Sequence, residues 1–232
     1  MNPTSLAALA SVVALTVLAG CGGGRDDGTT GGTAGGVAGG AAGGTQTTPK
    51  IVVDDLSTGN YVVSLGGASS PIVGKYYAGA DGSRLLVAAD AKDTASQIYR
   101  RAAGGSWIAV PPSDKDVSVA LLRSGSAPAA PVTLTSLAGH YVSMLADQTI
   151  IDFNVSAAGD ISPGTSTCKL TGKLSAGALQ DTLSWSLSTT GCSTLPASSN
   201  GIVAADADYA PARFRMVGDS GTRLVELWAF AQ

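Results

Sequence analysis

The chain is poor in charged and aromatic side chains and has a single histidine. Charged residues make up 13% of its 232 residues, about half the ~25% of soluble domains, and aromatic residues make up 5%. This scarcity disfavours a coiled coil, an acidic disordered tail and a charge-rich helical bundle. The chain has no basic run and its formal charge is −3, so it offers no electrostatic surface for a nucleic-acid partner.

Motifs that hold a cofactor or a metal ion are also scarce. Asp54-Asp55 and Asp206-Ala207-Asp208 lack the glycine and distal glutamate of a calcium loop, so we interpret them as solvated loop carboxylates. The dense glycines do not lie between a strand and a helix, where a phosphate-binding loop would need them. The sequence predicts no cofactor and no metal site.

The N-terminal residues have the features of an export signal. Residues 6–19 are uncharged and rich in Ala, Val and Leu, and they are fewer than the ~20 residues that span a bilayer. They lead into Leu18-Ala19-Gly20-Cys21, which resembles the lipobox of bacterial lipoprotein precursors. The resemblance implies that residues 1–20 are a signal peptide and that Cys21 is lipidated, with fatty-acyl chains such as palmitate. In that class Asp after the cysteine retains the protein at the inner membrane, so Gly22 favours the outer membrane.

Residues 21–48 have the composition of a flexible tether. Positions 22–48 hold 12 glycines, and Val37 is their one large apolar side chain. Such a segment buries too little apolar surface to offset the entropy cost of ordering. We therefore expect a disordered segment between the lipidated cysteine and the folded part.

The rest of the chain predicts short strands separated by turn residues. We expect a smaller N-terminal β lobe at residues 49–123, a connector at 124–131, and a C-terminal lobe of seven or eight strands at 132–232. This spacing is typical of an all-β fold with an antiparallel barrel or sandwich. The expected strands are 59–65, 72–78, 85–87, 95–101, 117–122, 139–145, 149–155, 167–174, 182–187, 201–205, 213–217 and 223–230.

Two cysteines of the C-terminal lobe are placed to form a disulfide. Cys168 and Cys192 are equidistant from Gln180, so a hairpin that turns near residues 176–180 sets them across from each other. Neither has an adjacent His or second Cys that would indicate a metal site. In an exported protein we expect them to pair.

A second hairpin contains the most suggestive catalytic pattern of the chain. A two-residue turn at Asp219-Ser220 would set Arg213 opposite Glu226. Gly218-Asp219-Ser220-Gly221 also resembles the nucleophile segment of chymotrypsin-like serine proteases, which implies His140 as base and Asp147 or Asp152 as its partner. Thr222 departs from that pattern, and the 80 residues between His140 and Ser220 are too few for a second barrel. We therefore predict no catalytic residues.

The functional expectation is a non-catalytic envelope protein, anchored by lipid, whose β-rich body binds a protein partner. Two alternatives stay open at this point. Gly139-His140-Tyr141 resembles the Gly-x-Trp start of lipocalins, which implies a carrier of a small apolar ligand. The other alternative is a hydrolase with a site built from loops.

Overall fold

The computed structural model describes residues 48–127 and 130–232, which belong to one compact unit. The regular structure of the described residues is almost entirely β-strand, with two short 3₁₀ turns, η1 (Thr135–Leu137) and η2 (Ala207–Tyr209). The predicted all-β class is confirmed. The predicted signal peptide and tether lie outside the described residues, apart from Thr48.

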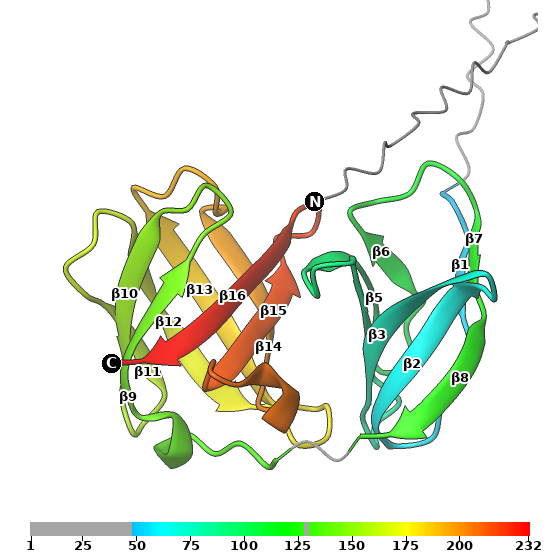
Figure 1. Cartoon of the computed structure of the whole chain (residues 1–232), viewed down its shortest axis with the longest axis horizontal. Coiled ribbons are helices and arrows are strands. Elements are labelled where there is room, and N and C mark those ends of the chain that lie inside the picture. Colours follow the sequence, from blue (N-terminus) through cyan, green and yellow to red (C-terminus); the bar gives the residue numbers. More distant parts are fainter. Residues whose placement is uncertain (1–47, 128–129) are drawn as a thin grey trace, which may run out of the picture. The chain divides into compact units, whose positions relative to one another are not determined.

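Eight antiparallel strands form a closed barrel (Figure 1). Each strand pairs with the next along the chain, and the last returns to the first through Phe230 opposite Val142 and Ala231 opposite Tyr141. The strands are β9 (Gly139–Met144), β10 (Ile150–Val155), β11 (Asp160–Pro163), β12 (Lys169–Ala176), β13 (Leu183–Thr190), β14 (Ser198–Ala204), β15 (Phe214–Asp219) and β16 (Leu224–Ala231).

The strands of the barrel alternate between an apolar inner face and an outer face. In β13, Leu183, Trp185 and Leu187 are buried, and serines lie between them. The β12–β13 hairpin sets Leu174 opposite Trp185, a register one residue away from the predicted one. The predicted register would set Leu174 opposite Ser186, on the other face. A one-residue slip moves every side chain to the wrong face, so burial selects the observed register.

Two features of the barrel were not expected from the sequence. Strand β11 has one apolar residue, Ile161, among its four, and it ends at Pro163, so it carries little strand pattern. The ladder between β15 and β16 extends to Asp219 opposite Leu224. The predicted two-residue turn at Asp219-Ser220 and the pairing of Arg213 with Glu226 are therefore wrong, because Asp219 belongs to the strand.

Two glycines allow β14 and β15 to approach closely. Gly201 lies directly opposite Gly218, and a Cβ atom at either position would collide with the backbone of the neighbouring strand. Glycine at paired positions is a known device for bending strands at the corner of a barrel. The close packing of the two strands thus accounts for Gly218, the first glycine of the segment that resembles a protease motif.

A six-stranded antiparallel sheet precedes the barrel, with the strand order β6-β5-β4-β3-β2-β8 (Figure 1). A separate parallel pair, β1 and β7, accompanies it. Ser124–Ser126, which composition assigns to a connector, form the end of β8. The strands are β1 (Ile51–Val53), β2 (Gly59–Gly67), β3 (Ser70–Ala78), β4 (Arg84–Ala89), β5 (Ala95–Arg101), β6 (Ile108–Val110), β7 (Val117–Val119) and β8 (Leu121–Ser126).

The two faces of this sheet bury different apolar clusters. Tyr76 belongs to a cluster with Val53 and Val119 of the β1–β7 pair. The next residue, Tyr77, belongs to a cluster with Ile202 and Val217 on the outer face of the barrel. Because neighbouring residues of a strand point to opposite faces, the sheet is covered on both sides.

The first strands of the sheet and of the barrel begin with the same short motif. Gly59-Asn60-Tyr61 opens β2, and Gly139-His140-Tyr141 opens β9. The Tyr61 hydroxyl donates to the Ser57 carbonyl at 3.1 Å, and the Tyr141 hydroxyl donates to the Leu137 carbonyl at 3.1 Å. Each hydroxyl reaches back four residues, and a Cβ atom on the motif's glycine would lie within 3.3 Å of it. The motif therefore fixes the start of the first strand in both the sheet and the barrel.

Candidate functional site

The residues of the protease-like pattern lie at opposite ends of the barrel. Ser220 follows β15 in the turn that leads to β16, whereas His140 lies beside the end of β16, where its carbonyl accepts the Gln232 N–H at 3.1 Å. The eight residues of β16 separate them by about 25 Å at ~3.3 Å per residue. No Ser-His pair forms from these two residues.

Asp152 lies near His140 but has a structural role. His140 Nε2 is 3.5 Å from Asp152 Oδ2. The carboxylate accepts the backbone N–H groups of Thr165 and Ser166 at 2.7 and 2.6 Å. These bonds hold the pKa of Asp152 well below its ordinary value. The side chain fastens the loop between β11 and β12 to β10.

The interior of the barrel is filled by side chains. Tyr141 packs against Phe214 and Phe153, with ring centroids 4.7 and 5.8 Å apart. Trp185 is also buried there, with its indole N–H donating to the Ile202 carbonyl at 2.9 Å. These side chains belong to one continuous cluster of buried residues. A carrier of an apolar ligand needs a cavity of several hundred Å³, and this cluster occupies the space where it would lie.

The sheet and the outer face of the barrel share an apolar cluster of their own. Barrel residues contribute to it through β14, β15, the connection between β12 and β13, and the chain around η2, and sheet residues contribute through β3 to β6. Its buried members are Tyr77, Leu85, Val87, Ala95, Ile98, Val110, Leu179, Ile202, Ala204, Tyr209, Ala212 and Val217. The hydroxyls of Tyr77 and Tyr209 meet within it at 3.1 Å. This contact makes the two lobes one packed body.

A hollow of about 260 Å³, here the Lys75 hollow, lies between the sheet and the barrel. Lys75 Nζ lies 2.7 Å from Asp206 and 3.3 Å from Asp208, and 5.8 Å from the centroid of the Tyr209 ring. Burial alone would lower the pKa of Lys75, but the hydrogen bonds to Asp206 and Asp208 and the nearby negative charge of Asp206 together outweigh burial and raise the pKa. The amine therefore stays protonated and is a poor nucleophile.

Arg215 forms a second ion pair beside this hollow. Its Nε and Nη2 atoms lie 2.7 and 2.6 Å from Glu226 Oε1, and its guanidinium lies 4.9 Å from the centroid of the Trp228 ring. The side chains of Arg215 and Glu226 are only 4% and 8% exposed. Glu226 Oε2 also accepts the N–H of Ala95, from the sheet, at 2.9 Å. This carboxylate bridges the two lobes.

A groove of about 470 Å³ lies on another side of the shared cluster. Arg100, from the sheet, donates from Nε and Nη2 to the carboxylate of Asp219, from the barrel, at 2.7 and 3.2 Å. Asp219 Oδ1 also accepts the Gly221 N–H at 2.6 Å. Arg100 and Asp219, the charged groups that line the groove, are thus paired with each other.

The carboxylates of the acidic pairs that the sequence analysis named form more hydrogen bonds and ion pairs than expected. Asp206 is 16% exposed in its ion pair with Lys75, whereas Asp208 is 74% exposed. Asp55 bonds Arg84 and Arg101, each at 2.6 Å, and Asp54 accepts the Leu121 N–H at 2.8 Å. Asp54 and Asp55 are exposed loop residues, as interpreted from the sequence, whereas the interpretation as a solvated carboxylate is wrong for Asp206. Across residues 48–127 and 130–232, no group of three His, Cys, Asp or Glu side chains is placed to hold a metal ion.

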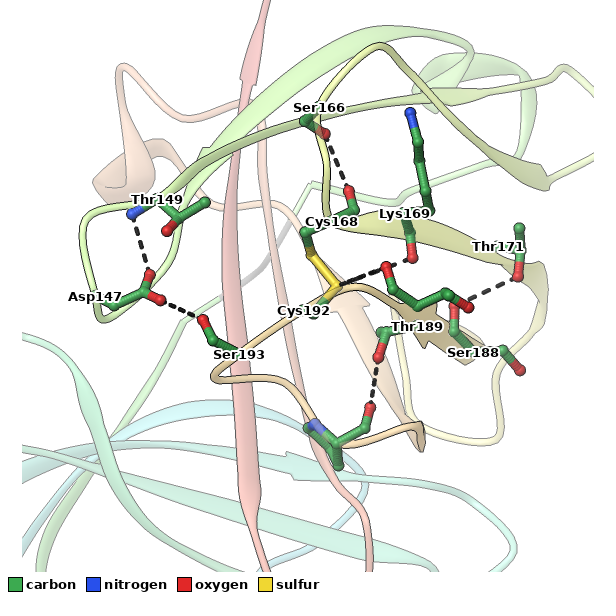
Figure 2. The surroundings of a disulfide bond; sticks show 12 residues. Asp147, Thr149, Ser166, Cys168, Lys169, Thr171, Ser188, Thr189, Cys192 and Ser193 are labelled. Atoms are coloured by element: carbon green, nitrogen blue, oxygen red, sulfur yellow. Dashed lines mark hydrogen bonds between the residues drawn. A yellow bond between two sulfur atoms is a disulfide. The ribbon is translucent and has the colours of Figure 1, made fainter.

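The predicted disulfide between Cys168 and Cys192 is confirmed (Figure 2). It lies just beyond the last ladder pair of the hairpin, Lys169 opposite Thr190. Figure 2 shows the Asp147 carboxylate between the hydroxyl of Ser193 and the N–H of Thr149, both of which donate to it. The hydrogen bond from Ser193 lowers the pKa of Asp147. Disulfide and carboxylate together fasten the loop after β13.

Several large apolar side chains are exposed. Met144 and Ile150, which lie opposite each other at the end of the β9–β10 hairpin, are 63% and 66% exposed. The others in the described part of the chain are Val52, Ile72, Val73, Ile108 and Leu122. Of these, Leu122 lies on the edge strand β8.

The predicted lipidation site, Cys21, lies outside the described residues together with Gly22. Sequence reasoning missed the ion pairs of Lys75, Arg100 and Arg215. The first two join residues 131 and 119 positions apart, and no local pattern marks such a pair. Arg215 and Glu226 lie on neighbouring strands, and a correct register for β15 and β16 would have revealed them.

Comparison with known proteins finds no matching family, no matching curated protein and no matching solved structure. Within the part of the chain that the structure describes, no helix is both long and apolar enough to cross a membrane.

Proposed function

We propose that the chain is a lipid-anchored lipoprotein of a bacterial cell envelope, and that its β-rich body binds partner proteins through its surface. The observation that carries this proposal is Leu18-Ala19-Gly20-Cys21 directly after an uncharged apolar stretch. In this proposal residues 1–20 are removed and Cys21 carries the lipid. Two or more acyl chains on one protein give a stable anchor. No cofactor takes part.

The segment that follows sets the reach of the body. We propose that residues 21–48 are a tether between the lipid and the two lobes, at 49–123 and 132–232. A Gly-rich chain spans about 5–6 Å × √n, so such a tether would hold the body roughly 25–30 Å from the lipid surface. This reach suits a protein that contacts other envelope components.

The structure supports a surface role over chemistry inside the barrel. Side chains fill the barrel interior. Lys75, Arg100 and Arg215, the cations of the two hollows, are paired with carboxylates. A site for acid–base or nucleophilic chemistry needs a group free to take or give a proton. The same groups serve well to fix the shape of a binding surface.

Membrane fractionation of Cys21→Ser tests the anchor. We expect the wild-type chain in the membrane fraction and Cys21→Ser outside it. The matched pair Gly22→Asp and Gly23→Asp then tests which membrane holds the protein. Gly22→Asp should move the protein from the outer to the inner membrane, and Gly23→Asp should leave it in the outer membrane. Retention of Cys21→Ser in the membrane fraction would disprove the lipid anchor.

A further inference from the structure

Strand β8 is an open edge of the six-stranded sheet. It is last in the strand order, and β2 is its neighbour on one side. Residues Leu122–Ser126 are all exposed. An edge strand presents unpaired N–H and C=O groups that pair with another extended backbone. The chemistry of this edge therefore selects an extended polypeptide as its partner.

The hydrogen-bond pattern identifies which residues of β8 point outward. Ala127 N–H donates to the Asn60 carbonyl at 2.9 Å, so this opposed pair is a hydrogen-bonded one. Opposed residues of an antiparallel ladder alternate between hydrogen-bonded and non-hydrogen-bonded pairs. Gly125 and Arg123, two and four residues earlier, therefore turn their backbone groups toward β2. Ser124 and Ser126 turn theirs outward.

Gly125 has no internal reason to be glycine. A Cβ atom there would meet nothing within 4 Å, and its φ is outside the left-handed region. Glycine weakens a strand interior and often marks a place where another backbone or side chain approaches closely. The space above Gly125 is therefore available to a partner.

We propose that β8 pairs antiparallel with β8 of a second copy, across a two-fold axis at Ser124. In this register Ser124 lies opposite itself and Arg123 lies opposite Gly125 of the second copy. Leu122, at which the ladder between β2 and β8 shifts register, falls near Ser126 of the second copy. The outward backbone groups of Ser124 then bond each other. Because the contact is isologous, each Arg123 gains the open space above a Gly125.

Charge and backbone direction exclude the neighbouring register. An axis at Arg123 would set two guanidinium groups directly opposite each other, which destabilises a strand pair. It would also centre the contact on a residue whose backbone groups face β2. Both criteria favour an axis at Ser124 over one at Arg123.

This inference names a partner for the surface role proposed above and rests on it. A contact of about five residues on each copy is small, and a shared membrane anchor strengthens it by raising the effective concentration. The cross-linking test below measures the association of two copies, whereas membrane fractionation measures the lipid anchor. Cross-linking in a chain that also carries Cys21→Ser would therefore support the β8 pairing, whatever fractionation shows about the anchor.

Cysteine cross-linking in the full chain tests the register. A hydrogen-bonded pair has Cα atoms about 5.5 Å apart, within the range of a disulfide. Ser124→Cys should give a species of twice the chain mass on a non-reducing gel. Ser126→Cys is the matched control, since its two Cα atoms would be roughly 13 Å apart at ~3.4 Å per residue. The wild-type chain controls for Cys21, and mass spectrometry checks that Cys168 and Cys192 remain joined.

A disrupting variant completes the test. Gly125→Val adds a side chain where the structure leaves space, so the monomer should fold as before, with unchanged circular dichroism. In the Ser124→Cys background it should reduce the cross-linked fraction at least fivefold, because it occupies the place of Arg123. Equal cross-linking of the Ser124→Cys and Ser126→Cys variants, no product above the wild-type level, or a product of another mass would overturn the pairing.

Discussion

The barrel and the six-stranded sheet follow the same strand plan, but only the barrel closes. Each begins with Gly-x-Tyr, continues as an antiparallel meander, and ends with a strand that returns to pair with the first. The motif's tyrosine lies opposite the final residue of that last strand in both, Tyr141 opposite Ala231 and Tyr61 opposite Ser126. The shared plan shows that strand order alone does not decide closure.

The two regions differ in whether any strand has a neighbour on one side only. Every barrel strand has two neighbours, whereas the sheet ends at β6 and β8. Strand β6 has three residues and is followed by Pro111 and Pro112, which cannot donate to a new ladder. Strand β8 is twice as long and has no proline, and its ladder with β2 shifts register at Leu122. Closure thus gives the barrel a self-contained surface, and the sheet keeps one edge able to accept a strand.

The largest effect should come from the bond that joins the two regions. Glu226→Ala leaves the Arg215 guanidinium buried without its partner, and the N–H of Ala95 without an acceptor. Breaking a buried pair costs about 3–5 kcal/mol, so urea unfolding followed by tryptophan fluorescence should show that loss.

The matched control for Glu226→Ala is Asp160→Ala. Asp160 is 60% exposed in its pair with Lys173, and exposed pairs contribute about 0–1 kcal/mol. Equal losses in the two variants would contradict the bridging role of Glu226. Two separate transitions in the wild-type chain would contradict the view that sheet and barrel unfold together.

The disulfide belongs to the barrel alone, and its removal should be the next largest effect. Cys168 and Cys192 are 24 residues apart, and closing such a loop stabilises a protein by about 3 kcal/mol. We expect the double variant Cys168→Ser, Cys192→Ser to lose that amount in chemical unfolding. Protection of sheet amides against hydrogen exchange should change less than protection of β12 and β13. A uniform loss would weaken the contrast between the two regions.

These two sites differ in how far the sequence predicts them. The cysteines were found because they are equidistant from Gln180 and because polar and apolar residues alternate in the strands of their hairpin. Glu226 was assigned the wrong partner because Gly218-Asp219-Ser220-Gly221 has the composition of a tight turn, although Asp219 is paired to Leu224. Tertiary pairing overrides turn propensity there, as it does for Ser124–Ser126 in β8.

The reach of local sequence patterns also explains why the Lys75 and Arg100 ion pairs were not predicted. The strand positions follow from alternation and turn residues, which act over a few positions. The Lys75 and Arg100 ion pairs depend on how the sheet packs against the barrel, and that packing depends on a cluster contributed by both lobes. The Gly-x-Tyr motif at Gly59 and Gly139 has a structural reason, because each tyrosine hydroxyl donates to a carbonyl four residues upstream.

The tyrosine motifs allow a direct comparison of equivalent positions. Tyr141→Phe removes a bond from a side chain that is 3% exposed, and a typical hydrogen bond contributes about 0.5–1.5 kcal/mol. Tyr61 is only partly buried, and its hydroxyl also contacts Ser57 Oγ at 2.8 Å, so water and this neighbour compensate for the loss. We expect thermal unfolding to show a clear decrease for Tyr141→Phe and a smaller one for Tyr61→Phe. The reverse order would mean that the motif matters more in the open sheet.

The smallest effect should be a pH-dependent one at the ion pair between Lys75 of the sheet and Asp206 of the barrel. Burial would raise the pKa of Asp206, but the hydrogen bonds from Lys75 and from the Asp208 N–H bring it below 3.8. A group whose folded pKa is lowered stabilises the fold above its unfolded pKa and loses that contribution as the pH falls.

Asp206→Asn keeps an acceptor for the Asp208 N–H and removes the charge. We expect it to cost less than about 1 kcal/mol near pH 7, as ion pairs that water still reaches do. Its difference from the wild type should shrink as the pH falls below about 4, where the wild-type carboxylate takes up its proton. Asp208→Asn, at an exposed carboxylate 3.3 Å from the same amine, should show little difference at any pH. If Asp208→Asn matched Asp206→Asn, the contact between sheet and barrel would depend on overall charge rather than on the single pair of Lys75 and Asp206.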